Sequence, residues 1–406
     1  MKEKAVPSIR FSGFTERWQS RRLSELTKPV GRRNKNGLEL ETYAVTNDRG
    51  FIPQNEAHDV YGYMQNVDQS MYNIVPPNSF AYNPARINVG SIGYYSGKTD
   101  VLVSSLYEVF STSDNIDDGF LAQWIQTRIF QDWIRKLQEG SVRLYFYYDK
   151  LCEVLLNYPQ IEEQQKIADF LSSVDDVIST SKEEVANLEK QKKAVMKKIF
   201  SQEVRFKRGD GTDFPEWEEV TVGDVTAFHK QGYYTNEEYV SDGYKIARVS
   251  DLYSPVVVYD DMPMVPMTDK DYQAFKIETG DFLIARSGSI GRYGIVYDIP
   301  EDSRVVFGSF VIKFQFDVEK ITNEYFGQYY SSTFAEKSLK TITQTGANVN
   351  INAENIKSMK MLLPCLEEQR LIADFLSSFD EAITTAKKEL ELWKELKKGL
   401  LQQMFV

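Results

Sequence analysis

The sequence predicts an α+β protein in which two globular mixed α/β domains are joined by two long antiparallel coiled-coil helices, as a pseudo-twofold internal repeat. Three observations predict this fold class: a 42-residue segment occurs twice, both copies carry a heptad pattern, and β-prone runs with turn residues precede each copy. The expected boundaries are residues 1–158 for the first domain, 159–200 for the central helix, 201–363 for the second domain and 364–406 for the C-terminal helix.

The repeated segment reads IEEQQKIADFLSSVDDVI from Ile161 and LEEQRLIADFLSSFDEAI from Leu366. Residues 159–200 align with residues 364–405 without a gap, and 19 of the 42 aligned pairs are identical. Identity at this level across an unbroken alignment is far above chance, so the sequence indicates an internal duplication.

Each copy has the features of a long helix. A proline, Pro159 or Pro364, precedes it at a place where the ring cannot interrupt helical hydrogen bonds. Glutamates fill the first turn, where they complement the helix dipole, and lysines gather at the end of the first copy. A helix of about 39 residues extends roughly 58 Å, so the pair could act as a spacer.

Apolar residues fall at the a and d positions of heptads along both copies, which favours a coiled-coil seam between the two helices. Lys192 and Lys397 occupy the same seam position in the two copies. Two interpretations are open at this point. The lysines could make polar contacts that fix the register of the seam, or their side chains could extend out of it into solvent.

The two domains share short motifs but otherwise differ. The segments Arg10–Leu26 and Arg205–Val225 share an Arg-Phe pair and a later tryptophan. Gly-Ser-Ile-Gly occurs at Gly90–Gly93 and again at Gly288–Gly291. So short a motif could bind phosphate, but a tight structural turn is the favoured interpretation. Runs such as DFLIAR alternate with Gly, Asp and Asn turns, which indicates mixed α/β domains.

Charge and composition limit the class of function. The net charge is −11, but residues 1–50 carry 11 basic and 6 acidic residues, whereas residues 201–365 carry 17 and 25. Any DNA site must therefore be a local patch that a more basic partner completes. We expect a cytoplasmic protein, because the N-terminus lacks an apolar signal-peptide core, no apolar run reaches membrane-span length, and the two cysteines are far apart.

Motifs of catalysis are absent from the sequence. It contains neither the phosphate-binding loop GxxxxGK[ST] nor GxGxxG, HExxH or CxxC. Only two histidines are present, which disfavours a histidine-rich metal site. We therefore expect no catalytic residue, no bound cofactor and no metal in this chain.

The tandem motif resembles that of a known family. Pro-x-x-Glu-Glu-Gln-x-x-Ile-Ala-x-Phe-Leu-x-x-x-Asp-x-x-Ile occurs twice, each time after a β-rich domain that holds a Gly-Ser-Ile-Gly loop. Trp18 and Trp217 open the two domains, each with an aliphatic residue five positions later. Over essentially its whole length, the chain resembles the specificity subunit of type I restriction–modification systems.

The resemblance implies DNA recognition without catalysis. Each globular domain would be a target recognition domain that reads one half of an asymmetric, two-part site in double-stranded DNA, and the long helices would set the unread gap. The helices would also dock two methyltransferase subunits, which bind S-adenosylmethionine and methylate adenine. Restriction subunits that use ATP and magnesium to translocate DNA would complete the complex.

Candidate DNA contacts follow from side-chain chemistry. Arginine and lysine reach phosphate or guanine, asparagine and glutamine pair with adenine, and aromatic rings stack on bases. Solvated surface charge is the alternative for each basic residue. The candidates are Arg32, Arg33, Asn34, Lys35, Arg86 and Arg143 in the first domain, and Lys230, Gln231, Tyr233, Arg286, Arg292, Gln344, Asn348 and Asn350 in the second.

The acidity of residues 201–365 keeps a second function open. The chain could be a coiled-coil scaffold that binds two protein partners and never contacts DNA. Salt-sensitive DNA binding would separate the two functions, because only phosphate contacts release counterions from the duplex.

Overall fold

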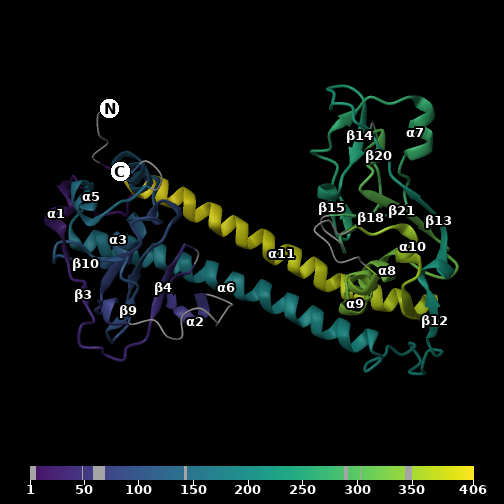
Figure 1. The fold of residues 1–406 in the computed structure, drawn as a ribbon, viewed down its shortest axis with the longest axis horizontal. Helices are drawn as coiled ribbons and strands as arrows, with labels where there is room; N and C mark the ends of the chain where they lie inside the picture. Colours follow the sequence, from purple (N-terminus) through teal and green to yellow (C-terminus); the bar gives the residue numbers. More distant parts are fainter. Residues whose placement is uncertain are drawn as a thin grey trace. The chain divides into compact units, whose positions relative to one another are not determined.

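A computed structural model describes residues 6–47, 49–57, 69–140, 144–287, 291–301, 303–342 and 350–406 (Figure 1). The chain divides into two compact units. The first unit comprises Met1–Lys182 and Lys388–Val406, and the second comprises Glu183–Lys387. Each unit therefore contains one globular domain and one stretch from each of the two long helices.

The first unit is built around a four-stranded antiparallel sheet in the order β2-β10-β7-β8. Its core contains Phe80 and Phe110, whose rings stack with centroids 5.1 Å apart. The four strands are Thr27–Pro29, Glu108–Thr112, Ser79–Tyr82 and Ile92–Tyr95. The other strands are β1 (Gln19–Arg22), β3 (Arg32–Arg33), β4 (Tyr43–Thr46), β5 (Gly50–Pro53), β6 (Asn73–Val75), β9 (Val101–Val103) and β11 (Leu155–Tyr158). The short helices are α1 (Leu23–Leu26), α2 (Gln54–Ala57), α3 (Asp118–Trp124), α4 (Arg128–Leu137) and α5 (Tyr148–Glu153).

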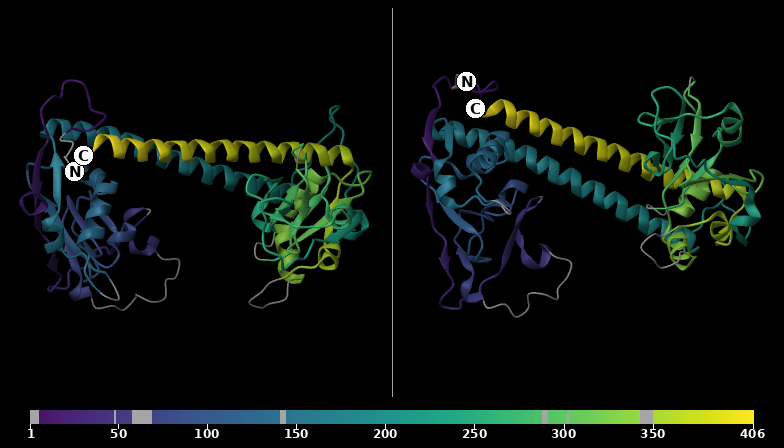
Figure 2. Two further views of the ribbon diagram at one scale, coloured as in Figure 1. Left: turned by 90° about the horizontal axis from the view of Figure 1, so that it is seen from above. Right: turned by 45° about the horizontal axis from the view of Figure 1, so that its top comes forward.

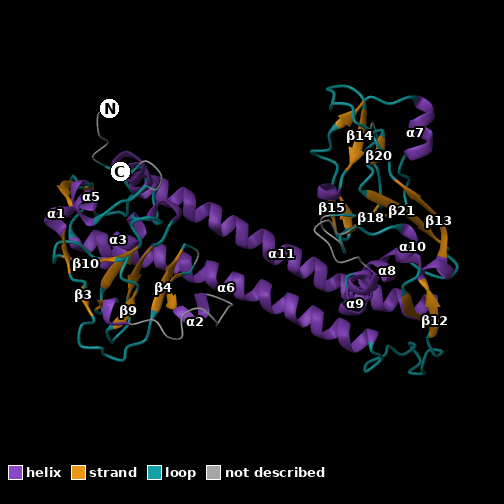
Figure 3. Cartoon of the chain, viewed as in Figure 1, coloured by secondary structure: helices purple, strands orange, loops and turns teal. Residues whose placement is uncertain are grey.

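The second unit has a six-stranded sheet in the order β13-β21-β18-β19-β16-β15 and a three-stranded sheet in the order β17-β14-β20 (Figure 3). The larger sheet uses Thr226–Gln231, Val311–Phe316, Phe282–Ala285, Tyr293–Ile295, Val256–Val257 and Leu252–Tyr253. The smaller sheet uses Met264–Val265, Tyr244–Ala247 and Val305–Phe307. The remaining strands and short α-helices are β12 (Glu218–Thr221), β22 (Lys360–Leu363), α7 (Asp269–Phe275), α8 (Asn323–Tyr330), α9 (Thr333–Ile342) and α10 (Ala353–Lys357).

The two units repeat one topology. Strands β13, β21, β18 and β19 follow the same neighbour order as β2, β10, β7 and β8. In both units the strand that opens the domain pairs antiparallel with the strand that closes it, β1 with β11 and β12 with β22. The duplication predicted from the helices therefore extends through the sheets, although the sequences of the strands differ.

Both predicted long helices are present, as α6 (Ile161–Phe200) and α11 (Leu366–Met404). In the first unit, Val174 and Ile178 of α6 pack against Leu390 of α11. In the second unit, the C-terminal end of α6 shares a core with the N-terminal part of α11, through Ile199 and Leu376 among others. The helices thus run antiparallel within each unit, as the heptad pattern predicts (Figure 2).

The two seam lysines are paired inside the helix interface. Lys192 Nζ lies 2.6 Å from Asp380 Oδ1, and Lys397 Nζ lies 2.5 Å from Asp175 Oδ1. The lysine side chains are only 13% and 11% exposed. Of the two interpretations of these lysines, polar pairing is therefore confirmed, and extension into solvent is wrong.

A glutamine from each globular domain completes these polar clusters. Gln123 Nε2 donates to Asp175 at 2.9 Å, and Gln328 Nε2 donates to Asp380 at 2.8 Å. Each aspartate thus receives hydrogen bonds from the facing helix and from its own domain. These three residues are equivalent in the repeat, so the same polar pairing sets the helix register in both units. In the first unit Lys397 Nζ also donates to Gln126 Oε1 at 2.7 Å.

Candidate nucleic-acid interface

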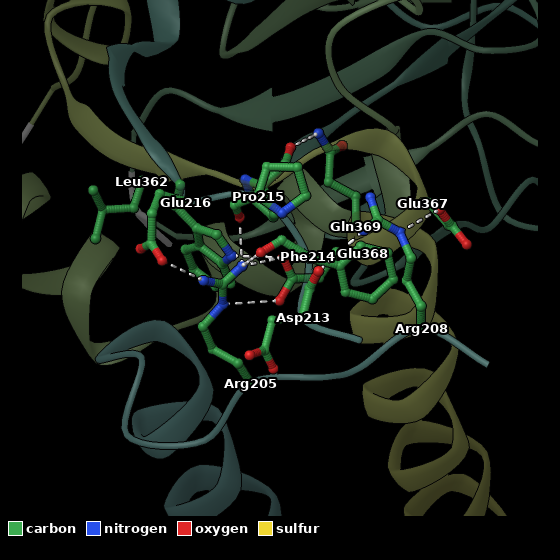
Figure 4. A network of polar contacts seen from close by, with 12 residues as sticks. Arg205, Arg208, Asp213, Phe214, Pro215, Glu216, Leu362, Glu367, Glu368 and Gln369 are labelled. Atoms are coloured by element: carbon green, nitrogen blue, oxygen red, sulfur yellow. Dashed lines mark hydrogen bonds and ion pairs between the residues drawn. The ribbon is translucent and has the colours of Figure 1, made fainter. Parts of the chain in front are cut away.

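The repeated Glu-Glu-Gln motif fastens each long helix to its own domain. In the second unit Glu368 is fully buried, and Arg205 binds both of its carboxylate oxygens, with Nη2 3.0 Å from Oε2 (Figure 4). Trp217 Nε1 donates to the same carboxylate at 2.8 Å. The hydrogen bond to Glu368 raises the pKa of the Arg205 guanidinium. In the first unit Arg10 binds Glu163 in the same way, with Nε 2.6 Å from Oε1.

The glutamine of the motif holds the loop that leads into a short helix of its own domain, α8 in the second unit and α3 in the first. Gln369 Oε1 accepts from the backbone N–H of Thr322 at 2.9 Å, and Gln369 Nε2 donates to the carbonyl oxygen of Lys320 at 2.7 Å. Gln164 makes the equivalent bonds to Asp117 and Asn115 in the first unit. The motif therefore attaches each long helix to its domain. The Arg-Phe pair that the two domains share in sequence contains the arginines, Arg10 and Arg205, that bind the glutamates of the motif.

A hollow of about 1090 Å³ opens on the first unit beside β3 and the start of β10; we name it the first hollow. It is lined by polar side chains that sequence analysis selected and by aromatic ones that it did not. Arg33 and Arg86 are the selected residues. The aromatic residues are Tyr107, Tyr145 and Tyr147, and the rings of the last two stack with centroids 5.5 Å apart. Further polar residues of the wall are Asn73, Asn83, Asn88, Ser105 and Glu108.

Three of the remaining candidates of the first domain are described by the structure. Arg32 is 66% exposed and pairs with Asp100 at 2.7 Å. Lys35 is exposed. Asn34, however, is only 1% exposed, and its amide bonds the backbone of Leu38 through both its oxygen and its nitrogen. Asn34 closes a turn, and this placement argues against the prediction that it contacts DNA.

A second hollow, of about 720 Å³, opens on the second unit where β13 ends and β21 begins; we name it the second hollow. Among the candidates that the structure describes, Tyr233 is the one in its wall. Two exposed carboxylates, Glu237 and Glu238, line it together with hydroxyl groups and aromatic rings. Its arginine, Arg248, binds both carboxylate oxygens of Asp251, and this hydrogen bonding raises the pKa of the guanidinium.

The other described candidates of the second domain are not part of this wall. Lys230 Nζ donates to the carbonyl oxygen of Ala274 at 2.7 Å and lies 4.1 Å from the centroid of the Phe275 ring, so it is bound to α7 and is a poor candidate for DNA. Arg292 donates to the carbonyl oxygen of Val249 at 3.4 Å. Arg286 is half-buried, and its Nε has no hydrogen-bond partner among the described residues. Gln231 and Asn350 are exposed. Arg143, Gln344 and Asn348 lie outside the described residues, as does most of the second Gly-Ser-Ile-Gly motif.

Both hollows occupy the same place on the shared topology. Each adjoins the residues that follow the edge strand, β2 or β13, and the residues that lead into the neighbouring strand, β10 or β21. Sequence reasoning missed Arg248, Tyr239 and Phe310 in the second hollow. It also missed the tyrosines of the first hollow, although the alternation of Tyr145 and Tyr147 around the fully buried Phe146 was a usable signal.

The described residues include no group of three or more His, Cys, Asp or Glu side chains arranged to hold a metal ion. None of their helices is both long enough and apolar enough to cross a membrane.

Comparison with known proteins identifies the family. The model for the type I restriction modification DNA specificity domain matches residues 15–190 and again residues 215–392. Among curated proteins, the type I restriction enzyme MjaVIII specificity subunit of Methanocaldococcus jannaschii is 25% identical, with 77% of this chain and 75% of that protein aligned. The putative MjaX specificity subunit of the same organism is 23% identical over 98% of this chain and 95% of that protein.

Solved structures share the fold. A type I restriction–modification S subunit from M. genitalium covers 99% of both chains with a TM-score of 0.58 and 14% identity. A chain from a structure of the assembly and conformational transition of the type I system covers 96% of this chain and 97% of its own length, with a TM-score of 0.56 and 15% identity. The doubled match of the family model spans both repeats and most of the sequence, so the chain belongs to the type I restriction–modification DNA specificity family.

Proposed function

We propose that the chain reads a two-part DNA site, one half with residues 1–158 and the other with residues 201–363. Membership of the DNA specificity family supports a recognition role, and it makes the chain the non-catalytic partner in a larger system. The observation that carries the proposal is the pair of hollows at equivalent sheet positions with unlike walls. Two domains that share a strand topology but line their hollows with different side chains suit the recognition of two different half-sites.

The proposed contacts are exposed or half-buried polar residues near the hollows. Arg33 and Arg86 line the first hollow and would reach guanine or phosphate, whereas Tyr233 lines the second. Arg32, Lys35, Gln231, Arg286, Arg292 and Asn350 complete the proposed set on the described residues. Arg143, Gln344 and Asn348 stay candidates from sequence alone.

The partners follow from the proposed role. The long helices would dock two methyltransferase subunits that bind S-adenosylmethionine, and restriction subunits with ATP and magnesium would join them in the cytoplasm. Apolar side chains exposed on the helices support docking: Val177, Leu392 and Leu396 in the first unit are 37%, 57% and 47% exposed. Leu371 and Phe375 in the second unit are 38% and 40% exposed.

Coexpression with the methyltransferase subunits of a type I system tests the proposal. We expect adenine methylation at one two-part motif in host DNA, detected by single-molecule sequencing. Arg86→Ala should weaken the complex on DNA by about 1–3 kcal/mol and relax one position in one half of that motif. An intact complex that methylates no two-part motif would contradict the proposal.

A scaffold that binds only proteins remains the second candidate, because acidic side chains line the second hollow. The slope of DNA affinity against salt concentration separates the two. A DNA reader loses affinity steeply as salt rises, because its phosphate contacts release counterions. A protein scaffold shows no such DNA binding at any salt concentration.

A further inference from the structure

We propose that the two hollows read opposite kinds of base edge: the first reads purine edges, and the second reads the edges of cytosine and thymine. This inference rests on the proposed function and extends it to the chemistry of each half-site. It follows from which hydrogen-bond donors, acceptors and apolar groups each wall presents.

The first hollow presents donors. Arg33 and Arg86 are exposed and line its wall. Arg33 Nη1 already donates to the carbonyl oxygens of Met71 and Ser105, at 2.5 and 3.3 Å. The Arg86 side chain forms no ion pair with a described residue and can donate two hydrogen bonds to guanine O6 and N7. Asn88 adds an exposed side-chain amide, which can pair with adenine N6 and N7, whereas Asn73 Nδ2 donates to the carbonyl oxygen of Tyr107 at 2.7 Å. The carboxyl group in this wall, Glu108, is half-buried, and burial raises its pKa. The wall is therefore suited to the acceptor-rich edges of purines.

The second hollow presents acceptors. Glu237 and Glu238 are exposed in its wall, and neither carboxylate forms an ion pair with a described residue. An ionised carboxylate can only accept hydrogen bonds, and the cytosine N4 amino group is the donor that it pairs with in the major groove. Two free carboxylates disfavour contact with a phosphate and favour contact with an amino group.

The arginine of the second hollow is already occupied. Arg248 donates from Nε to Asp251 Oδ2 at 3.0 Å and from Nη2 to Asp251 Oδ1 at 2.9 Å. The pair of donors that would bind guanine is thus directed at a carboxylate within the domain. Arg286 precedes Ser287 of the wall but is not itself part of the wall.

Exposed aromatic rings add an apolar component. Tyr239 and Phe310 line the second hollow and are 62% and 61% exposed. Large aromatic side chains left in solvent on the wall of a hollow mark a binding surface. In the major groove the apolar feature is the thymine methyl group, which side chains such as phenylalanine contact.

The shared position of the hollows favours DNA over a basic protein segment as the occupant of the second. Both lie next to the same pair of strands in the repeated topology. A duplicated fold presents equivalent surfaces, so both surfaces are expected to face the same class of ligand. The acidic second wall also accounts for part of the excess of acidic residues between residues 201 and 365.

The test uses the full chain in complex with its methyltransferase subunits and duplexes with randomised half-sites. Glu237→Gln and Glu238→Gln replace an acceptor by an amide of the same shape, which pairs with adenine. We expect one variant to change its preferred base from cytosine to adenine at one position, by roughly 5- to 150-fold. Arg86→Gln should alter the other half-site, and Glu319→Gln, an exposed carboxylate outside the wall, should alter neither.

Replacing thymine by uracil in one half-site at a time gives a second readout, because uracil lacks only the methyl group. We expect a roughly fourfold loss of affinity in the half-site that the glutamate variants affect. Phe310→Ala should abolish that loss. A loss confined to the half-site that Arg86→Gln affects would overturn the inference.

The remaining outcomes separate the inference from the proposed function. If the wild-type complex binds no two-part site, the proposed function itself fails. If it binds one and both glutamate variants keep the wild-type base preference, the inference is overturned and the proposed function stands. If either variant instead weakens assembly with the methyltransferase and leaves base preference unchanged, the hollow holds a basic protein segment and the inference is again overturned.

Discussion

Two carboxylates, Glu163 and Glu368, show how single residues hold the long helices to their domains. Both are fully buried, and each is neutralised by one arginine from the start of its own domain, Arg10 or Arg205. A buried charge is tolerated only when it is paired and hydrogen-bonded, so the arginine and the carboxylate depend on each other.

Glu368→Gln should therefore destabilise the second unit. The substitution leaves Arg205, which is 20% exposed, with only the exposed Glu216 as a counter-charge, and removal of one partner from a buried pair costs about 3 kcal/mol. Urea unfolding of the full chain measures the change. Glu367→Gln is the matched control, because this neighbouring carboxylate is 63% exposed and should change stability by less than about 0.5 kcal/mol. Equal effects of the two substitutions would contradict the anchoring role.

A pH dependence follows from Glu108. Burial raises the pKa of its carboxyl, the charge of Asp149 raises it further, and Arg33 lowers it. A carboxyl group whose pKa is higher in the folded chain favours folding while protonated, and this contribution is lost as pH rises through the folded pKa. The stability of Glu108→Gln relative to wild type should thus increase between about pH 4 and about pH 8. Thermal unfolding across that range checks the sign, and a constant difference would contradict it.

At the scale of elements, two ion pairs at seam positions set the register of the antiparallel helix pair. Lys192–Asp380 and Lys397–Asp175 are equivalent ion pairs within the second and the first unit. Polar residues at seam positions cost stability but disfavour every alignment that leaves them unpaired. The helices and the seam could be predicted from heptad periodicity, because both depend on the local spacing of apolar residues.

A double-mutant cycle measures the pair in the second unit. Lys192→Met and Asp380→Asn should each destabilise the chain, with a coupling of about 1 kcal/mol or more, since the lysine is 13% and the aspartate 29% exposed. Glu189 and Lys387 form an ion pair on the surface of the same helices, 47% and 56% exposed, and serve as control. Their coupling should be below about 0.5 kcal/mol. Similar values for both pairs would mean that the seam pair sets no register.

At the scale of the whole molecule, the division into units falls at equivalent places in the repeat. The boundary in α6 lies between Lys182 and Glu183, and that in α11 lies between Lys387 and Lys388. Both points lie inside the long helices, and the packing that stabilises each unit lies within that unit. Length can therefore be added at these two points without removing contacts of either unit.

Insertion of one heptad at both boundaries should lengthen the unread gap of the proposed DNA site. Seven helical residues add about 10 Å, which corresponds to about 3 base pairs of duplex DNA. The methylation motif in host DNA measures the gap and both half-sites together. An insertion in only one helix breaks the register of the seam and should abolish assembly. Altered half-sites with an unchanged gap would contradict the role of the helices as a spacer.

The duplication, the helices and the mixed α/β class could be predicted from sequence, whereas the walls of the hollows could be predicted only in part. Lys230 is bound to α7 by Ala274, a residue 44 positions away, and no local pattern signals that contact. Arg248 is occupied by Asp251 in the folded domain, although its residue type alone suggests a reader of guanine. Asn34 was predictable in principle, because asparagine commonly closes short turns.

The glutamines that complete the seam clusters have a consequence for domain exchange. Gln123 and Gln328 belong to the globular domains, yet they bond aspartates of the long helices, as Arg10 and Arg205 bond the helix glutamates. A foreign domain grafted onto these helices must therefore bring an arginine and an amide at these positions. Grafted domains that carry both residues should be interchangeable whatever bases they recognise. A grafted domain that lacks the arginine would leave the buried helix glutamate without a counter-charge.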